Sequence, residues 1–182
     1  MGYVLFGCQV LTGLVFVVAG ITKLRDVDGF RRSMLALVPL PVALSPAAAR
    51  ALIGLELLVV ALLVVPATVA AGLALSLILD LAFTVAIVLA LRAGRRAPCA
   101  CFGRTERPLG IRHVVRDLVL AAVALLGLVA AAAPHTPANA GGLLVAGLAG
   151  ALGGLLVILL DDIVALFAPG PSGRASSAEE AW

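Results

Sequence analysis

Two cysteines separated by one residue, Cys99 and Cys101, are the side chains best suited to chemistry in this sequence. A disulfide between them would close a small, strained ring, and strained disulfides are readily reduced. Nearby positive charge favours the thiolate, which is the attacking form of a cysteine. That charge comes from Arg95, Arg96 and Arg104. The pattern therefore predicts thiol–disulfide exchange, and the structural alternative is a pair of unrelated small loop residues.

Metal binding is the other chemistry that two neighbouring cysteines can support. A CxC pair offers two thiolates to zinc or copper, but a complete site needs further ligands. The nearby candidate is His113, and the sequence contains no second CxC or CxxC. We therefore predict no metal site. About 20 Å of helix separates Cys8 from the end of its own apolar run, so we expect Cys8 to be a small packing residue rather than a resolving cysteine.

Two acidic residues, Glu56 and Asp80, interrupt apolar runs at a similar distance from the run ends. Ionisable groups at such a depth are costly and usually face the bundle interior with a partner. They predict either a proton or quinone site in which one carboxyl stays protonated, or hydrogen bonds that fix the register of the helices. Lys23 and Arg25 end the first run, and either can bend its stem toward Glu56 or serve as a surface anchor.

Arg116 and Asp117 open a later apolar run, shortly after the cysteine segment. They are candidates for an ion pair, or for residues that orient the cysteine segment from below. The ordinary preference for acidic residues near a helix N-terminus explains Asp117 equally well. We assign no role to His113 or His135.

The composition excludes a water-soluble protein. Of the 182 residues, 63% are hydrophobic and 13% are charged, and the mean hydropathy is +1.18. When glycine is counted and tyrosine left out, the apolar share rises to roughly 73%, against about 45–50% in soluble domains. A soluble fold of this size cannot hide so much apolar surface. The basic excess is small and confined to short loops, so we also expect no nucleic-acid partner.

Five apolar runs approach the roughly 20 residues that a helix needs to cross a bilayer. They are residues 3–22, 47–65, 68–91, 113–133 and 141–167. Only helices or closed barrels span lipid, and unbroken Leu, Val and Ala runs of this length predict helices. Residues 27–44 predict a short interfacial helix ended by prolines, and residues 169–182 predict a disordered tail. Gly150 and Gly154, in the fifth run, have a spacing that permits close helix contact.

The basic residues predict an orientation in the membrane. All 13 Lys and Arg residues lie in or beside the first loop, the third loop or the tail. With five spans these regions share one face, which the positive-inside rule makes cytoplasmic. We therefore expect a protein of the cytoplasmic (inner) membrane, in contact with the lipid bilayer, with an external N-terminus and a cytoplasmic CxC loop.

Taken in order, these residues resemble the MauE branch of the MauE/DoxX group of redox-associated membrane proteins. The resemblance covers about residues 3–133 and rests on short motifs. They are Gly20-Ile21-Thr22-Lys23-Leu24, Phe30, Glu56, Arg92 with Gly94, Cys99-Ala100-Cys101-Phe102-Gly103 and Arg116-Asp117. The last pair departs from the family's usual Arg-Asn.

The resemblance implies a four-helix membrane domain over residues 1–133, with an interfacial segment at 27–44 and a CxC loop at 92–112. Residues 141–168 then add a transmembrane helix. The resemblance also implies a role in maturing the disulfide-rich small subunit of methylamine dehydrogenase, alongside a thioredoxin-like partner. By analogy with DsbB and vitamin K epoxide reductase, a membrane quinone is a candidate cofactor. This chain lacks the CxxC of those enzymes and carries one redox pair where they carry two.

We therefore expect an all-α, multi-pass transmembrane bundle with a four-helix core and a fifth transmembrane helix, acting as a thiol–disulfide oxidoreductase on a disulfide-containing client. Cys99 and Cys101 are the predicted catalytic pair, and Glu56 with Lys23 the predicted cofactor site. The predicted supporting residues are Arg92, Phe102, Gly103, Asp80, Arg116 and Asp117. The alternatives are a non-catalytic scaffold for a thioredoxin-like partner, and a small-molecule carrier that uses the intramembrane carboxylates.

The side of the membrane creates a conflict between two of these expectations. Disulfide formation is an extracytoplasmic task, whereas the charges place the CxC loop in the cytoplasm. Either the charge rule misleads here, or the pair exchanges with cytoplasmic thiols, or its electrons cross the membrane by another route.

Overall fold

A computed structural model describes residues 1–38, 41–94, 111–134 and 139–167, with side chains described as far as residue 160. The described residues contain six α-helices and two short 3₁₀ turns, and no β-strand occurs among them. The helices are α1 (Gly2–Arg25), α2 (Val27–Leu37), α3 (Ser45–Val64), α4 (Val69–Arg92), α5 (Ile111–Ala132) and α6 (Ala140–Phe167), and the turns are η1 (Val42–Leu44) and η2 (Pro66–Thr68). The all-α prediction is confirmed.

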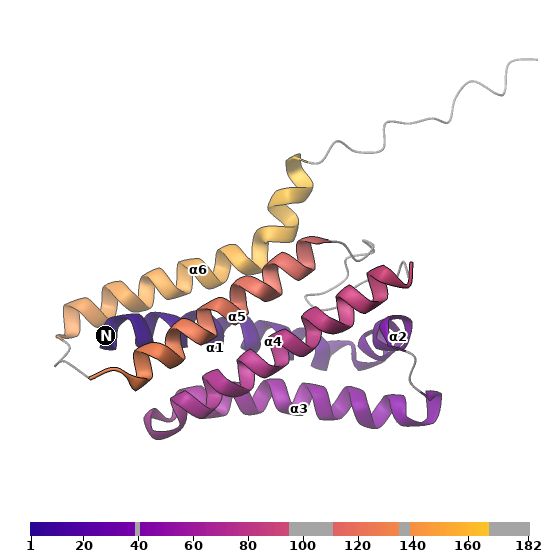
Figure 1. Ribbon diagram of the computed structural model, residues 1–182, viewed down its shortest axis with the longest axis horizontal. Coiled ribbons are helices and arrows are strands. Elements are labelled where there is room, and N and C mark those ends of the chain that lie inside the picture. The colour runs from indigo at the N-terminus through magenta and orange to yellow at the C-terminus, as the bar shows by residue number, and fades with distance from the viewer. Residues whose placement is uncertain (39–40, 95–110, 135–138, 168–182) are drawn as a thin grey trace, which may run out of the picture.

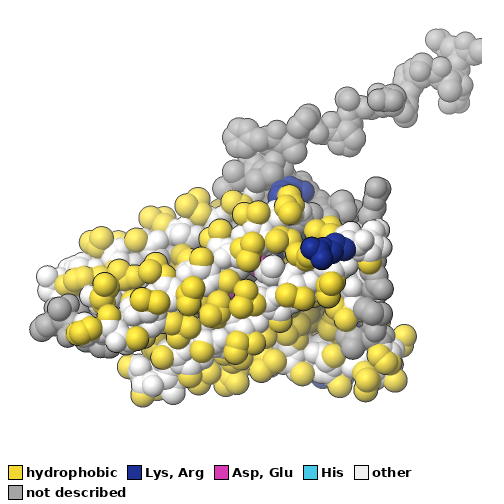
Figure 2. Space-filling view, viewed as in Figure 1, with side chains coloured by type: hydrophobic (Ala, Val, Ile, Leu, Met, Phe, Trp, Pro, Cys, Tyr) yellow, Lys and Arg dark blue, Asp and Glu magenta, His cyan; other side chains and the backbone are white. Residues whose placement is uncertain are grey.

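Five of these helices are long and apolar enough to cross a membrane: α1, α3, α4, α5 and α6. The mean hydropathy of their most apolar windows lies between 2.2 and 2.6, and each approaches the length that a span requires. Apolar side chains cover most of the face seen in Figure 2, as expected for a surface in contact with lipid. The prediction of a multi-pass membrane protein is therefore confirmed.

Four of the long helices form an antiparallel bundle, and the fifth packs outside it (Figure 1). Around the bundle, α1 contacts α3, α3 contacts α4, α4 contacts α5, and α5 returns to α1. The remaining long helix, α6, packs mainly along α1. The predicted four-helix core with one added helix is thus the observed architecture.

The antiparallel order places the ends of α1 and α4 beside the starts of α3 and α5, at the end of the molecule where α2 also lies (Figure 1). We call this the basic end, because the described Lys and Arg residues all belong to these terminal turns or to α2. They are Lys23, Arg25, Arg31, Arg32, Arg50, Arg92, Arg112 and Arg116. In Figure 2 the dark blue side chains gather at this end of the visible face.

The segment predicted to lie at the interface, residues 27–44, is helical over part of its length. The side chain of Asp26 caps α2 by accepting a hydrogen bond from the Gly29 amide at 2.8 Å. Phe30 is buried against Ala49 and Ile53 of α3, so α2 lies across the basic end. The helix ends earlier than its predicted limit at residue 44, because a residue that precedes proline avoids the helical conformation, and Val38 is extended.

The contact between α1 and α6 is close enough for the two backbones to touch. A Cβ atom added to Gly150 would collide with the carbonyl oxygen of Gly7. A Cβ atom on Gly154 would lie 3.3 Å from the carbonyl oxygen of Leu11. Small residues allow such an approach between membrane helices, so the spacing of Gly150 and Gly154 is used for packing. We call this contact the glycine seam.

Candidate functional site: a buried charged cluster

Four helices of the bundle bring five charged side chains together inside the half of the molecule nearer the basic end. They are Lys23 from α1, Glu56 from α3, Asp80 from α4, and Arg116 and Asp117 from α5. None of them is more than 5% exposed. Burying charge in an apolar medium is unfavourable unless the charges are paired and hydrogen-bonded. The members of this charged cluster are therefore expected to lie next to opposite charges or polar partners.

Lys23 and Glu56 form a buried ion pair that joins α1 to α3. Side chains lean toward the N-terminus of their helix, so Lys23 leans from the basic end into the bundle. Glu56 leans the opposite way, because α3 runs antiparallel to α1. Helix direction thus brings together the side chains of a residue near the end of α1 and a residue near the middle of α3.

Two aromatic rings also lie close to the Lys23 ammonium group. Its Nζ atom lies 5.1 Å from the ring centroid of Phe30 on α2 and 5.0 Å from that of Phe83 on α4. Both distances are within the range of cation–π attraction. Lys23 therefore joins four elements, since α1 carries it and α2, α3 and α4 supply its partners.

Arg116 and Asp117 form the second ion pair of the charged cluster, close to the start of α5. The Nε and Nη2 atoms of Arg116 lie 3.3 Å and 3.2 Å from Oδ1 of Asp117. These are neighbouring residues, so this pair holds no other helix to α5 by itself. Its two charges are nevertheless 4% and 5% exposed, and they face the same cavity as the other members of the charged cluster.

A small cavity lies at the centre of the charged cluster. Its volume is about 30 Å³, enough for one or two water molecules. All five charged residues line it, together with Val15, Phe16, Ala19, Phe83 and Leu120. Two of the carboxyl oxygens, Oε2 of Glu56 and Oδ2 of Asp80, are buried without a hydrogen-bond partner among the described residues.

The cavity does not fit a quinone. Sites that enclose small organic ligands usually measure about 300–1,000 Å³, an order of magnitude more than the space beside Glu56 and Lys23. The Lys23 ammonium is also already paired with Oε1 of Glu56, so it is not free to bind a quinone oxygen. The interpretation of Glu56 and Lys23 as a quinone site is therefore not supported by the geometry.

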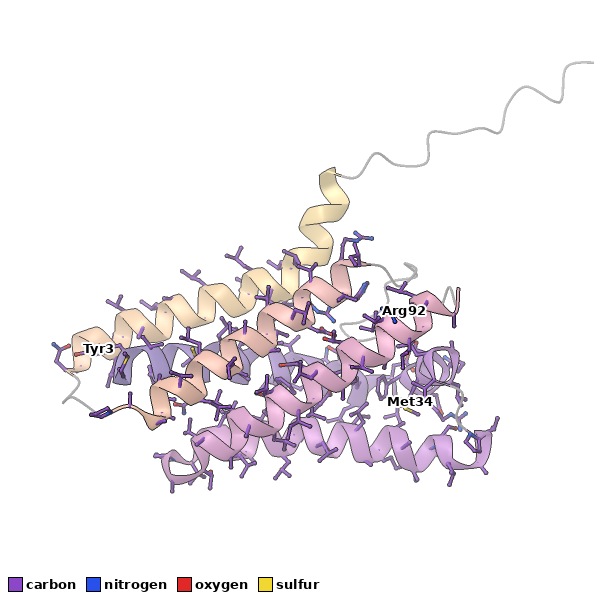
Figure 3. The ribbon with its side chains drawn as sticks, in the orientation of Figure 1. Tyr3, Met34 and Arg92 are labelled. Atoms are coloured by element: carbon purple, nitrogen blue, oxygen red, sulfur yellow. The ribbon has the colours of Figure 1, made fainter. Side chains whose placement is uncertain are left out.

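The remaining predicted residues lie elsewhere or outside the described part of the chain. Arg92 is exposed at the end of α4, at the basic end of the molecule, as Figure 3 shows. Arg25 is also exposed, so of the two cations that end α1 it is Lys23 that turns inward. Cys99, Cys101, Phe102 and Gly103 fall outside the described residues. Cys8 is buried, and its Cβ lies 3.1 Å from where a Cβ of Gly127 would be, between α1 and α5.

Sequence reasoning did not single out Phe83. Its position, three residues after Asp80, places both side chains on the same face of α4. That spacing was a usable signal, since a residue three positions from a buried charge faces the same side of the helix as that charge. In an apolar helix with many large side chains, however, it does not distinguish an aromatic partner of Lys23 from ordinary packing.

The fold and the charged cluster define a class: a multi-pass helical membrane protein whose four-helix core encloses paired charges. Comparisons with known proteins narrow this class. The family model described as methylamine utilisation protein MauE matches residues 1–130, which hold the four core helices almost to their end. The methylamine utilization protein MauE of Paracoccus denitrificans is 34% identical over 163 residues, covering 86% of this chain and 83% of that protein.

The chain therefore belongs to the MauE family. No solved structure matches it.

Proposed function

We propose that this protein is a membrane component of methylamine utilisation that supports disulfide formation in a partner protein through thiol–disulfide exchange at Cys99 and Cys101. Membership of the MauE family is the observation that carries the pathway. The CxC pair with its neighbouring arginines supports the chemistry. The disulfide-containing client of the family, the small subunit of methylamine dehydrogenase, is the proposed substrate.

The proposed reaction is a pair of exchanges in which the Cys99–Cys101 disulfide is the oxidant of the client. A client thiolate attacks a sulfur of the Cys99–Cys101 disulfide, which forms a mixed disulfide and releases one cysteine thiolate. A second client thiolate then attacks the mixed disulfide, so the client gains a disulfide and the pair becomes reduced. A disulfide in a thioredoxin-like partner reoxidises the pair by the same chemistry, and that partner takes up the two electrons.

The described residues contribute a rigid base for this reaction. The CxC segment connects α4 to α5, and those helices carry Asp80, Arg116 and Asp117 of the charged cluster. Lys23 and Glu56 tie α1 and α3 to the same base. We propose that Arg92, Phe102 and Gly103 position the cysteines above it. Exchange at a loop needs such support, because a reactive pair must be presented in one geometry to its partner.

The decisive experiment replaces both Cys99 and Cys101 with Ala in a methylamine-utilising host that lacks its own copy of the protein. The disulfide content of the small subunit, measured by thiol alkylation and mass spectrometry, should fall to the level of the deletion strain. Cys8→Ala is the matched control and should support normal disulfide content. Normal disulfides in the double variant would refute the exchange role. If a tagged thioredoxin-like partner still bound that variant, the non-catalytic scaffold would take its place.

The orientation needs its own test, because the charges predict a cytoplasmic CxC loop and client maturation predicts an external one. In a Cys8→Ala background, only Cys99 and Cys101 react with a membrane-impermeant maleimide. Labelling of intact cells that requires prior reduction would show an external disulfide and favour direct action on the client. Labelling confined to permeabilised cells, and independent of reductant, would show cytoplasmic thiols. Exchange would then pass through a cytoplasmic thiol system.

The carrier hypothesis receives no support from the cavity. A carrier needs an internal space of the size of its cargo, and the cavity beside Glu56 and Asp80, at about 30 Å³, is too small for an organic molecule.

A further inference from the structure

Asp80 is the member of the charged cluster that has no ion-pair partner among the described residues. The cluster contains two cations, and each is bonded to another carboxylate: Lys23 to Glu56 and Arg116 to Asp117. Asp80 is 3% exposed, and its Oδ2 atom has no hydrogen-bond partner among the described residues. Three carboxyl groups therefore share two cationic partners.

A negative charge left over at this position is strongly unfavourable. Asp80 lies about 18 Å along α4 from its basic end, and the helices packed around it leave it buried. An ionised carboxylate in such surroundings either finds a cation or takes up a proton. A single bound proton would leave two cations and two anions around the cavity, so the charges of the five residues would sum to zero.

The cavity supplies what a bound proton needs. It adjoins both Asp80 and Glu56, and each of these offers it an oxygen without a hydrogen-bond partner. The volume of about 30 Å³ accepts a water molecule, which requires two to four polar partners. A protonated Asp80 would donate to that water, and the water would donate to Oε2 of Glu56. Both unsatisfied oxygens are then satisfied.

We propose that the cavity lined by α1, α3, α4 and α5 is a proton-binding site, with the proton carried by Asp80 and a bridging water between Asp80 and Glu56. The site would give the membrane interior of this protein one exchangeable proton. This proposal stands apart from the proposed exchange chemistry, because it uses none of the residues of the CxC segment.

Other titratable groups surround Asp80 and must be distinguished from it. From α1 comes Lys23, from α3 Glu56, and from α5 Arg116, Asp117 and the buried His113, one turn before Asp117. On α2, Asp28 and Arg31 pair with each other at 3.7 Å and do not line the cavity. A charged imidazole at His113 would be the competing way to balance the third carboxylate, so the experiment must report on carboxyl protons alone.

Infrared spectroscopy meets that requirement, because a protonated carboxyl group has a carbonyl stretch that carboxylates and imidazolium ions lack. The full chain would be purified, placed in vesicles of ether-linked lipids, which have no ester carbonyl stretch in this region, and measured at neutral pH in H₂O and in D₂O. The wild type should show this band, and exchange into D₂O should shift it. Asp80→Asn should abolish the band, whereas the control Asp28→Asn, at an exposed position on α2, should retain it.

Three results would overturn the proposal: no such band in the wild type, a band that persists in Asp80→Asn, or a band that sodium ions remove at constant pH. The last would identify a metal-cation site instead. If Asp80→Asn failed to fold, Asp80→Glu serves in its place, because it keeps the acid and should keep the band at a displaced frequency. The measurement requires neither the cysteines nor a client, so its outcome is independent of the proposed function.

Discussion

Two contacts of the same helix hold this molecule together by different physical means. Toward α3, α4 and α5, the end of α1 inserts Lys23 into the charged cluster, where an ion pair and two aromatic rings surround its ammonium group. Toward α6, α1 presents Gly7 to Gly150 along the glycine seam, and the two backbones touch. The first contact depends on charge, and the second depends on the absence of side chains.

The difference follows from the solvent. Lipid tails are as apolar as leucine, so burying apolar surface provides no drive for one membrane helix to choose another. Helices must then recognise each other through polar groups or through close backbone packing. The core helices use polar groups, with specific partners and directions. The added helix, where its side chains are described, packs on α1 by shape, and just before its start the backbone amide of Asn139 donates a hydrogen bond to the hydroxyl of Tyr3 at 3.0 Å. Figure 3 labels Tyr3 at this end of the molecule.

The largest effect is expected for Lys23→Met, which removes the cation and leaves Glu56 buried without a partner. Breaking a buried ion pair from one side typically costs about 3–5 kcal/mol. Unfolding in mixed detergent micelles, followed by circular dichroism, would measure the loss. The double variant Lys23→Met with Glu56→Gln should recover part of it, because no unpaired charge remains. If the double variant instead lost as much stability as Lys23→Met and Glu56→Gln lose separately and added together, the ion pair would not be the source of the stabilisation.

A smaller and more local effect is expected for Gly150→Leu at the glycine seam. The new side chain would occupy the space of the Gly7 carbonyl, and overpacking of this kind costs about 1–3 kcal/mol. Protease accessibility of α6 should rise while the core helices stay protected. Gly54→Leu on α3 is the matched control, since nothing lies within 4 Å of a Cβ at that glycine. Equal effects of both changes would mean that the close approach of α1 and α6 is unimportant.

Phe83→Leu should weaken the charged cluster by less than the loss of Lys23 itself. The change removes one of the two rings near the ammonium group while keeping an apolar side chain, and one such interaction is worth about 0.5–2 kcal/mol. The same unfolding assay would be applied to Phe83→Leu in the wild type and in Lys23→Met. The effect should shrink when Lys23 is absent. An unchanged effect would show that Phe83 contributes packing and no cation–π attraction.

The smallest effect is expected for Cys8→Ala, at the contact between α1 and α5. Cys8 is buried without charge, so truncation removes one sulfur from a packed interface and should cost about 1 kcal/mol, as for other small truncations. Unfolding midpoints of the variant and the wild type would be compared under reducing conditions. A loss as large as that for Lys23→Met would show that Cys8 does more than pack.

Much of the fold was predictable because hydropathy depends on sequence alone. The five spans follow from the length and composition of the apolar runs, and their predicted limits lie close to the observed ones. The end of α2 was placed too late, since the prolines that follow it act on the residue before them. The sequence also indicated Glu56 and Asp80 as buried charges, because each interrupts an apolar run.

The partners of those charges were harder to predict. Either Lys23 or Arg25 was a candidate partner for Glu56, and the choice of Lys23 depends on which of two neighbouring residues faces α3. The meeting of Asp80 with Arg116 and Asp117 depends on α4 lying beside α5. The position of Phe83 against Lys23 depends on how closely α4 approaches α1, the helix opposite it in the bundle. None of these follows from the depth of a residue in its own span.

The sequence by itself determined that this protein is a set of apolar helices, how long they are, and which of their residues carry charge at which depth. Only the tertiary structure decided which helices are neighbours, and so which charge meets which and that, within the described part of the chain, Asp80 forms no ion pair. The physical reason is that protein and lipid are both apolar around these helices. Their outward and inward faces therefore look alike in the sequence until the helices pack.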